Sequence, residues 1–98
     1  MMQNTAKATV ENYCEAKHYG QSFVEAFEVW HCYILGNEKW LFGVIIDGRC
    51  EDLYFEVTYN KAKEEIYIDE YKKAANCCLS DKEHHTYATI REQLENNK

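Results

Sequence analysis

The stretch "LYFEVTYNKAKEEIYIDEY", residues 53–71, decides the fold, because it contains two strand patterns around one turn. "LYFEVTY" and "EIYIDEY" alternate apolar and polar side chains, which is the period of a strand with one buried face. Between them, "NKAK" is polar and short enough to form the loop of a hairpin. Pairing Phe55 with Ile68 collects the aliphatic side chains on one face, whereas a shift of one residue would scatter them. We therefore predict an antiparallel hairpin in this register, with its loop at residues 60–63.

The other face of this hairpin carries tyrosines between carboxylates, and we predict that it faces solvent. Residues 47–70 contain eight acidic and three basic side chains, so most of the net charge of −6 lies here. One interpretation is a merely solvated strand face, which needs polar residues in any protein. The other is a binding surface, because tyrosine offers contact area at little entropic cost and carboxylates pair with Lys or Arg. The candidate partner-binding residues are Asp52, Tyr54, Glu56, Glu65, Tyr67, Asp69 and Tyr71.

A second hairpin precedes the first in the chain. The run "FEVWHCYIL" is rich in aromatic and β-branched residues, so we predict a strand at Glu25–Leu35, a turn at residues 36–39 and a strand at residues 40–46. Pairing Leu35 with Trp40 leaves apolar side chains on both faces, which favours a central hairpin covered by helices or by another chain. We therefore predict weak dimerisation, with these candidate interface residues: Trp30, Ile34 and Trp40.

Helical patterns flank the four strands. The first runs over about residues 5–18, where Ala6, Val10 and Cys14 share one side at helical spacing. The second follows Ser80, which together with Glu83 has the spacing of a capping box. We predict a helix at residues 81–96 that lays an apolar stripe on the sheet, formed by Tyr87, Ile90 and Leu94.

These elements predict a single α+β domain over residues 1–98. Their order is α-β-β-β-β-α, with a mainly antiparallel four-stranded sheet packed with N- and C-terminal helices. A chain of 98 residues has room for only one hydrophobic core. No repeat or linker composition divides the chain further.

The stretch "CCLSDKEHH", residues 77–85, raises the question of a metal site. Zinc needs three or four converging ligands, yet adjacent cysteines on a strand face opposite ways and adjacent histidines on a helix diverge by about 100°. We therefore expect no metal, and no motif indicates a cofactor. The five cysteines are expected to be free thiols in a reducing cytoplasm, because the first residues lack the apolar run of a signal peptide or a membrane span.

The net charge of −6 disfavours direct contact with nucleic acid or with anionic membranes. No spacing of side chains specifies a reaction, so we do not expect an enzyme. We expect a small acidic cytoplasmic protein that binds and inhibits a basic protein partner, such as a nuclease or another nucleic-acid-binding protein. As a class, the chain resembles the small acidic inhibitors of phages and mobile elements, such as anti-CRISPR proteins, and immunity proteins. Its carboxylates could then stand in for phosphates, as a nucleic-acid mimic.

A different class of function stays open. The curved sheet and a helix could enclose a pocket for a small ligand or a substrate. The residues that would line this pocket are Trp30, His31, Tyr33 and Trp40.

Overall fold

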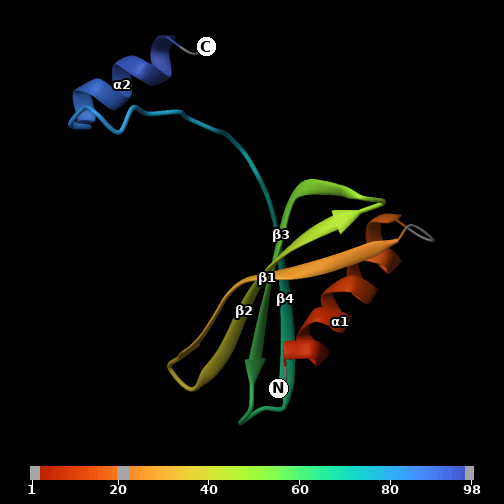
Figure 1. The fold of residues 1–98 in the computed structure, drawn as a ribbon. Helices are drawn as coiled ribbons and strands as arrows, with labels where there is room; N and C mark the ends of the chain where they lie inside the picture. The colour runs from red at the N-terminus through yellow and green to blue at the C-terminus, as the bar shows by residue number, and fades with distance from the viewer. Residues whose placement is uncertain (1–2, 20–22, 97–98) are drawn as a thin grey trace.

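The computed structural model of the protein describes residues 3–19 and 23–96. The α+β class, the order of the elements and the antiparallel four-stranded sheet are confirmed (Figure 1). The elements are the helix α1 (Gln3–Cys14) with its π-helical extension η1 (Glu15–Tyr19), the strands β1 (Val24–Ile34), β2 (Asn37–Ile46), β3 (Arg49–Asn60) and β4 (Glu65–Lys72), and the helix α2 (Tyr87–Asn96). The strand order in the sheet is β1-β2-β3-β4, so every strand pairs with its neighbour in sequence.

Two-residue turns join the first three strands. Leu35 and Gly36 connect β1 to β2, Asp47 and Gly48 connect β2 to β3, and all four have φ between 51° and 82°. Hairpin turns of type I′ require this left-handed conformation at both positions, because it matches the twist of the strands. The predicted turn at residues 36–39 is therefore wrong, since Asn37 already pairs with Ile34.

Both hairpins differ in register from the prediction. In the first, a bulge after Glu28 shifts the pairing, and Trp30 lies opposite Leu41. The predicted pairing of Leu35 with Trp40 is wrong, because Leu35 belongs to the turn. In the second, Ile68 pairs with Val57 instead of Phe55, because the loop lies one residue later than predicted. This shift moves the pairing by two positions, so every side chain of the second hairpin keeps its predicted face.

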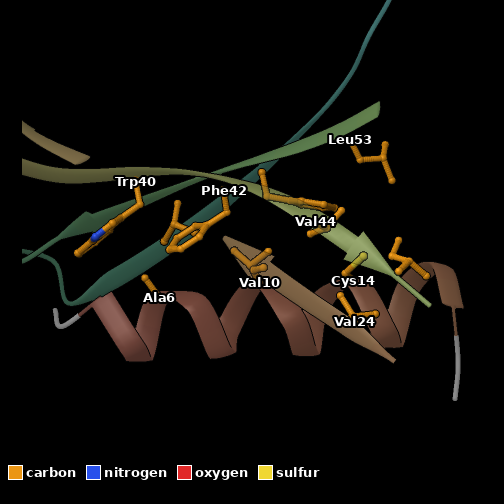
Figure 2. Close-up of a cluster of buried hydrophobic side chains, with 12 residues drawn as sticks. Ala6, Val10, Cys14, Val24, Trp40, Phe42, Val44 and Leu53 are labelled. Atoms are coloured by element: carbon orange, nitrogen blue, oxygen red, sulfur yellow. The ribbon is translucent and has the colours of Figure 1, made fainter. Parts of the chain in front are cut away.

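The core lies between α1 and one face of the sheet, which we call the covered face (Figure 2). From α1, the side chains of Ala6, Val10 and Cys14 are fully buried. They pack on sheet residues of which Trp40, Phe42 and Phe55 are the largest, and the other core side chains are Val24, Ala26, Val44, Ile46, Leu53 and Val57. Small side chains on α1 therefore let the helix approach large aromatic ones on the sheet.

A carboxylate of α1 also protects the edge of the sheet. The Oε2 atom of Glu11 accepts a hydrogen bond of 2.9 Å from the backbone N–H of Ala26 in β1. β1 is an edge strand, so this donor would otherwise be open to pairing with another strand. Glu11 also forms an ion pair of 3.4 Å with Lys7, one turn earlier in α1.

The C-terminal helix begins later than predicted. Ser80 does not cap a helix with Glu83; its hydroxyl oxygen accepts a hydrogen bond of 3.2 Å from the N–H of Lys82, within a turn. The cap is formed instead by Thr86 and Thr89. The N–H of Thr89 donates to the hydroxyl of Thr86 at 3.2 Å, and the N–H of Thr86 donates to the hydroxyl of Thr89 at 2.9 Å. Threonine takes the place of the usual Glu or Gln in this reciprocal cap, which hides it from a motif search.

The predicted packing of the C-terminal helix on the sheet is also wrong. None of the residues of α2 is buried. Figure 1 shows α2 away from the sheet, at the end of the segment of residues 73–86, in which every residue except the half-buried His85 is exposed. The covered face of the sheet is already occupied by α1, so an amphipathic pattern alone did not determine where α2 lies.

Candidate interaction surface

The face of the sheet opposite α1, which we call the open face, brings the candidate residues together. Residues that are directly paired on neighbouring strands point to the same face. The register therefore places three rows of side chains across the open face, namely Phe27-Gly43-Tyr54-Tyr71, Trp30-Leu41-Glu56-Asp69 and Cys32-Lys39-Thr58-Tyr67. A fourth row ends in Asn60 and Glu65. The candidate binding residues of β3 and β4 other than Asp52 thus share one surface.

This surface has two halves of different chemistry. The strands β1 and β2 provide the apolar half, which consists of Phe27, Trp30, Ile34, Leu41 and Ile45. The strands β3 and β4 provide the tyrosine–carboxylate half, which consists of Tyr54, Glu56, Glu65, Tyr67, Asp69 and Tyr71. The three tyrosines are 41–50% exposed, so their rings are available to a partner.

A glycine allows the aromatic surface to continue across β2. A Cβ atom at Gly43 would lie 2.3 Å from Cζ of Phe27, so the ring of Phe27 lies directly over the backbone of Gly43. Aromatic side chains often cover a strand glycine in this way. Phe27 therefore reaches toward Tyr54, and the row from Phe27 to Tyr71 is aromatic except for the glycine that it covers.

The carboxylates of the open face differ in how far they are neutralised. Glu56, predicted to face solvent, is only partly exposed, and its Oε1 lies 3.1 Å from Nζ of Lys39. Glu65 accepts a hydrogen bond from the hydroxyl of Tyr67, and this bond raises the pKa of Tyr67. Asp69 has no ion pair among the described residues. Asp69 and Glu65 are therefore the carboxylates best placed to meet a cationic partner.

Asp52 lies at the margin of this surface. Its side chain is 74% exposed, and its Oδ1 lies 3.9 Å from Nζ of Lys73. Two lysines that were not predicted, Lys39 and Lys73, offset the acidic charge here. Lys39 could have been found only with the correct register of β1, β2 and β3, because its partner lies in the neighbouring strand.

A polar cluster lies on the covered face, beside the core residue Trp40. The ring of His31 stacks on Trp40 at a centroid distance of 4.7 Å, and its Nε2 lies 2.7 Å from Oε2 of Glu38. Burial acts to raise the pKa of Glu38, but hydrogen bonds from Tyr33 and His31 act against it, and the pKa lies below its usual value. The hydrogen bond between Tyr33 and Glu38 also raises the pKa of Tyr33.

A cavity of about 310 Å³ opens beside this cluster, lined by Tyr33, Gly36, Glu38, Tyr59 and Lys61. The predicted pocket residues do not converge on it. Only Tyr33 lines the cavity, and Trp30 faces the opposite side of the sheet, because it follows the bulge in β1. Trp40, a predicted interface residue, is 1% exposed, so its side chain belongs to the core of the chain. Trp30 and Ile34 are exposed, as an interface requires.

The cysteines and histidines of residues 77–85 do not form a cluster. Cys77 and Cys78 are exposed and free, and His85 contacts the backbone carbonyl of Ser80 through its Nε2. Within residues 3–19 and 23–96, no three His, Cys, Asp or Glu side chains are placed to hold a metal ion. In the same part of the chain, no helix is long and apolar enough to cross a membrane.

Comparison with known proteins identifies the family of the chain. Residues 3–81 match the model of DUF6275, a family of unknown function, and the chain belongs to this family. The match includes α1 and all four strands and ends before α2. No match to the chain was found among the curated proteins or among the solved structures.

Proposed function

We propose that this member of the family is a non-enzymatic protein-binding domain, which binds a basic protein partner through the tyrosine–carboxylate half of the open face. The observation that carries this proposal is the placement of three exposed tyrosines beside Glu65 and Asp69 on a face that α1 leaves uncovered. Two of these tyrosines, Tyr54 and Tyr71, are directly paired across β3 and β4. They offer a rigid aromatic pair at one end of the surface.

The chemistry of this half favours a partner that presents Lys or Arg beside apolar atoms. Tyrosine is enriched at the energetically important positions of interfaces, because its large ring loses little conformational entropy on binding. Asp69 can pair with a cation of the partner without breaking an ion pair, because it has none among the described residues. Charges at the rim of an interface mainly speed association and exclude wrong partners.

The net charge of −6 favours a protein partner over nucleic acid. A basic partner of this kind includes nucleases and other proteins that bind nucleic acid. By covering their basic surface in the cytoplasm, the domain would act as an inhibitor, and its carboxylates would take positions that phosphates otherwise occupy.

The test compares two charge-reversed variants of equal net charge. In the first, Glu65→Lys and Asp69→Lys change the tyrosine–carboxylate half. In the control, Glu83→Lys and Glu92→Lys change exposed residues outside the sheet. Each protein is used to capture partners from the native host, and the captured partner is then titrated against all three proteins at low and at physiological salt.

We expect the first variant to lose at least tenfold in affinity and the control to lose less than twofold, with both folds intact by circular dichroism. Added salt should weaken binding by the native protein, because exposed charges are screened beyond about 8 Å. If the first variant binds as tightly as the native protein, the proposal is wrong and the face is only solvated.

The cavity beside Glu38 supports a second candidate, the binding of a small polar ligand. Its volume of about 310 Å³ is at the low end of ligand pockets. Ligands that bind there should stabilise the native protein against heat, and this stabilisation should disappear in a variant with Lys61→Ala. Stabilisation that persists in the variant would place the ligand elsewhere.

A further inference from the structure

The helix α2 has an apolar stripe without a surface to cover. Tyr87 is 83% exposed and Leu94 is 48% exposed, and they follow the spacing that puts them with Ile90 on one side of the helix. No described hydrogen bond or ion pair joins residues 74–96 to the rest of the described chain. A helix of ten residues is marginal in water on its own, even with the cap at Thr86 and an ion pair of 3.1 Å between Arg91 and Glu95. Its apolar stripe therefore needs a packing partner.

The apolar half of the open face is an apolar surface on which no described helix packs. Trp30 and Leu41 are directly paired, and Phe27 lies beside them over Gly43. Soluble sheets leave one face open when that face is polar, and a contiguous apolar area on it indicates an interaction site. The ten residues of α2 form a helix about 15 Å long and about 10 Å wide, so a helix that lies along β1 and β2 covers these two strands at about 4.8 Å spacing. The helix and the apolar half therefore match in chemistry and in size.

We propose that the apolar half of the open face is the docking site for α2 of a second copy of this chain, which makes the protein a reciprocal homodimer. Figure 1 shows the segment of residues 73–86 leading α2 away from its own sheet. The Cα radius of gyration is 17.3 Å, whereas a compact chain of this length has about 13 Å. An extended arm of this kind reaches a neighbouring molecule without any rearrangement of the chain. Two-fold symmetry then forms both helix–sheet contacts together.

The size of the contacts indicates a weak dimer. Two docked helices of this length bury on the order of 1,200 Å², the lower limit of stable interfaces. The tyrosine–carboxylate half stays uncovered in this dimer, so the inference does not depend on the proposed function. The family match ends at residue 81, so α2 lies outside the part of the chain that defines the family.

Sedimentation of the native chain over a range of concentration measures this dimer directly. We expect a dissociation constant on the order of 10 μM. Ile90→Glu with Leu94→Glu should weaken association at least tenfold, because the charges fall on the apolar stripe. The control pair Ala88→Glu and Asn96→Glu adds the same charge to the other side of α2 and should leave association within twofold. A native chain that stays monomeric at about 200 μM overturns the inference.

A mixing experiment identifies which surfaces touch. A second variant, Trp30→Glu with Leu41→Glu, disrupts the docking site but keeps α2 intact. Each variant alone should be monomeric. Their mixture should form a heterodimer weaker than the native dimer, because only one of the two contacts remains, between the intact helix of the site variant and the intact site of the helix variant. Circular dichroism checks that both variants are folded. If the mixture associates no more than either variant alone, or if the helix variant dimerises like the native chain, the proposed contact is wrong.

Discussion

The covered face and the open face of the sheet both carry aromatic side chains, yet α1 seals one, and no described element packs across the other. On the covered face, Phe42 and Phe55 meet Ala6 and Val10, so a helix with small side chains lies close to large ones on the sheet. On the open face, the ring of Phe27, from the sheet itself, lies over Gly43. The apolar side chains of the α2 stripe are larger than those of α1. The helix α2 also follows the sheet in sequence, and α1 already covers the core face of the sheet. An amphipathic pattern predicts that a helix will pack, but the pattern does not identify the surface.

The largest test of this comparison uses neighbouring residues of β2 that point to opposite faces. Phe42→Ala should cost about 3–5 kcal/mol of unfolding free energy, because Phe42 is fully buried and leaves a cavity. Leu41→Ala should cost less than about 1 kcal/mol at concentrations where the chain is monomeric, since Leu41 is on the open face. Urea denaturation followed by circular dichroism measures both. Equal losses would mean that the open face is packed in solution.

Thiol reactivity distinguishes the two faces without changing the sequence. Burial, followed by the charges of Glu70 and Glu51, raises the pKa of the Cys14 thiol to about 11. At pH 8 the reactive thiolate of Cys14 is therefore only on the order of 0.1% of the total. Cys32 is exposed on the open face. We expect Cys14 to react with a maleimide at least 100-fold more slowly than Cys32, as measured by mass spectrometry of peptides. Comparable rates would show that α1 separates from the sheet readily.

The pH dependence of stability tests the polar cluster at the end of the covered face. The pKa of Glu38 is lower in the folded chain than in the unfolded chain, so its ionised form stabilises the fold above about pH 4.5. This contribution is lost as the pH falls through the lowered folded pKa. Glu38→Gln should therefore cost about 1.5 kcal/mol at pH 7 and clearly less at pH 3. A cost that does not change with pH would mean that the charge of Glu38 is not involved.

The smallest expected effect concerns the start of α2. Thr86→Ala removes the hydroxyl that accepts from the N–H of Thr89, while the bond from the N–H of Thr86 to the hydroxyl of Thr89 remains. This loss should destabilise the helix by about 1 kcal/mol. Because α2 packs on no described surface of its own chain, the loss should appear in hydrogen exchange at the amide of Ile90, which bonds to the carbonyl of Thr86 at 3.0 Å. Global unfolding should not change. Ser80→Ala is the matched control. If this variant destabilised α2, the predicted cap at Ser80 would be supported after all.

Periodicity in the sequence was sufficient to predict the strands. Alternation and β-branched content located all four, and the aliphatic pattern of β3 and β4 placed every side chain of that hairpin on its correct face. The turns were less predictable. Leu35 has a φ of 51°, a conformation that leucine rarely adopts, so no turn residue marked the end of β1. The register of the first hairpin, and with it the pairing of Trp30, depended on that turn. The ion pair of Lys39 with Glu56 depends on the pairing of β2 with β3.

The candidate surface was predictable because it depends on local strand geometry, whereas the packing of α2 depends on the rest of the fold. Tyr54, Tyr67 and Tyr71 share a face because strand geometry alone decides it. The location of α2 depends on which surfaces remain free after the core forms, and local sequence carries no information about that. The neutralisation of Glu56 likewise depends on a lysine in another strand.

The order of the strands in the sheet, β1-β2-β3-β4, also bears on how the chain reaches its native state. Each strand pairs with the one that follows or precedes it, and two of the three connections are two-residue turns. Closing such short loops costs little chain entropy, and rates of folding rise as contacts become more local. The sheet can therefore grow by successive hairpins, from any point along it. The docking of α1, through contacts such as that of Glu11 with Ala26, adds contacts between residues farther apart in the sequence.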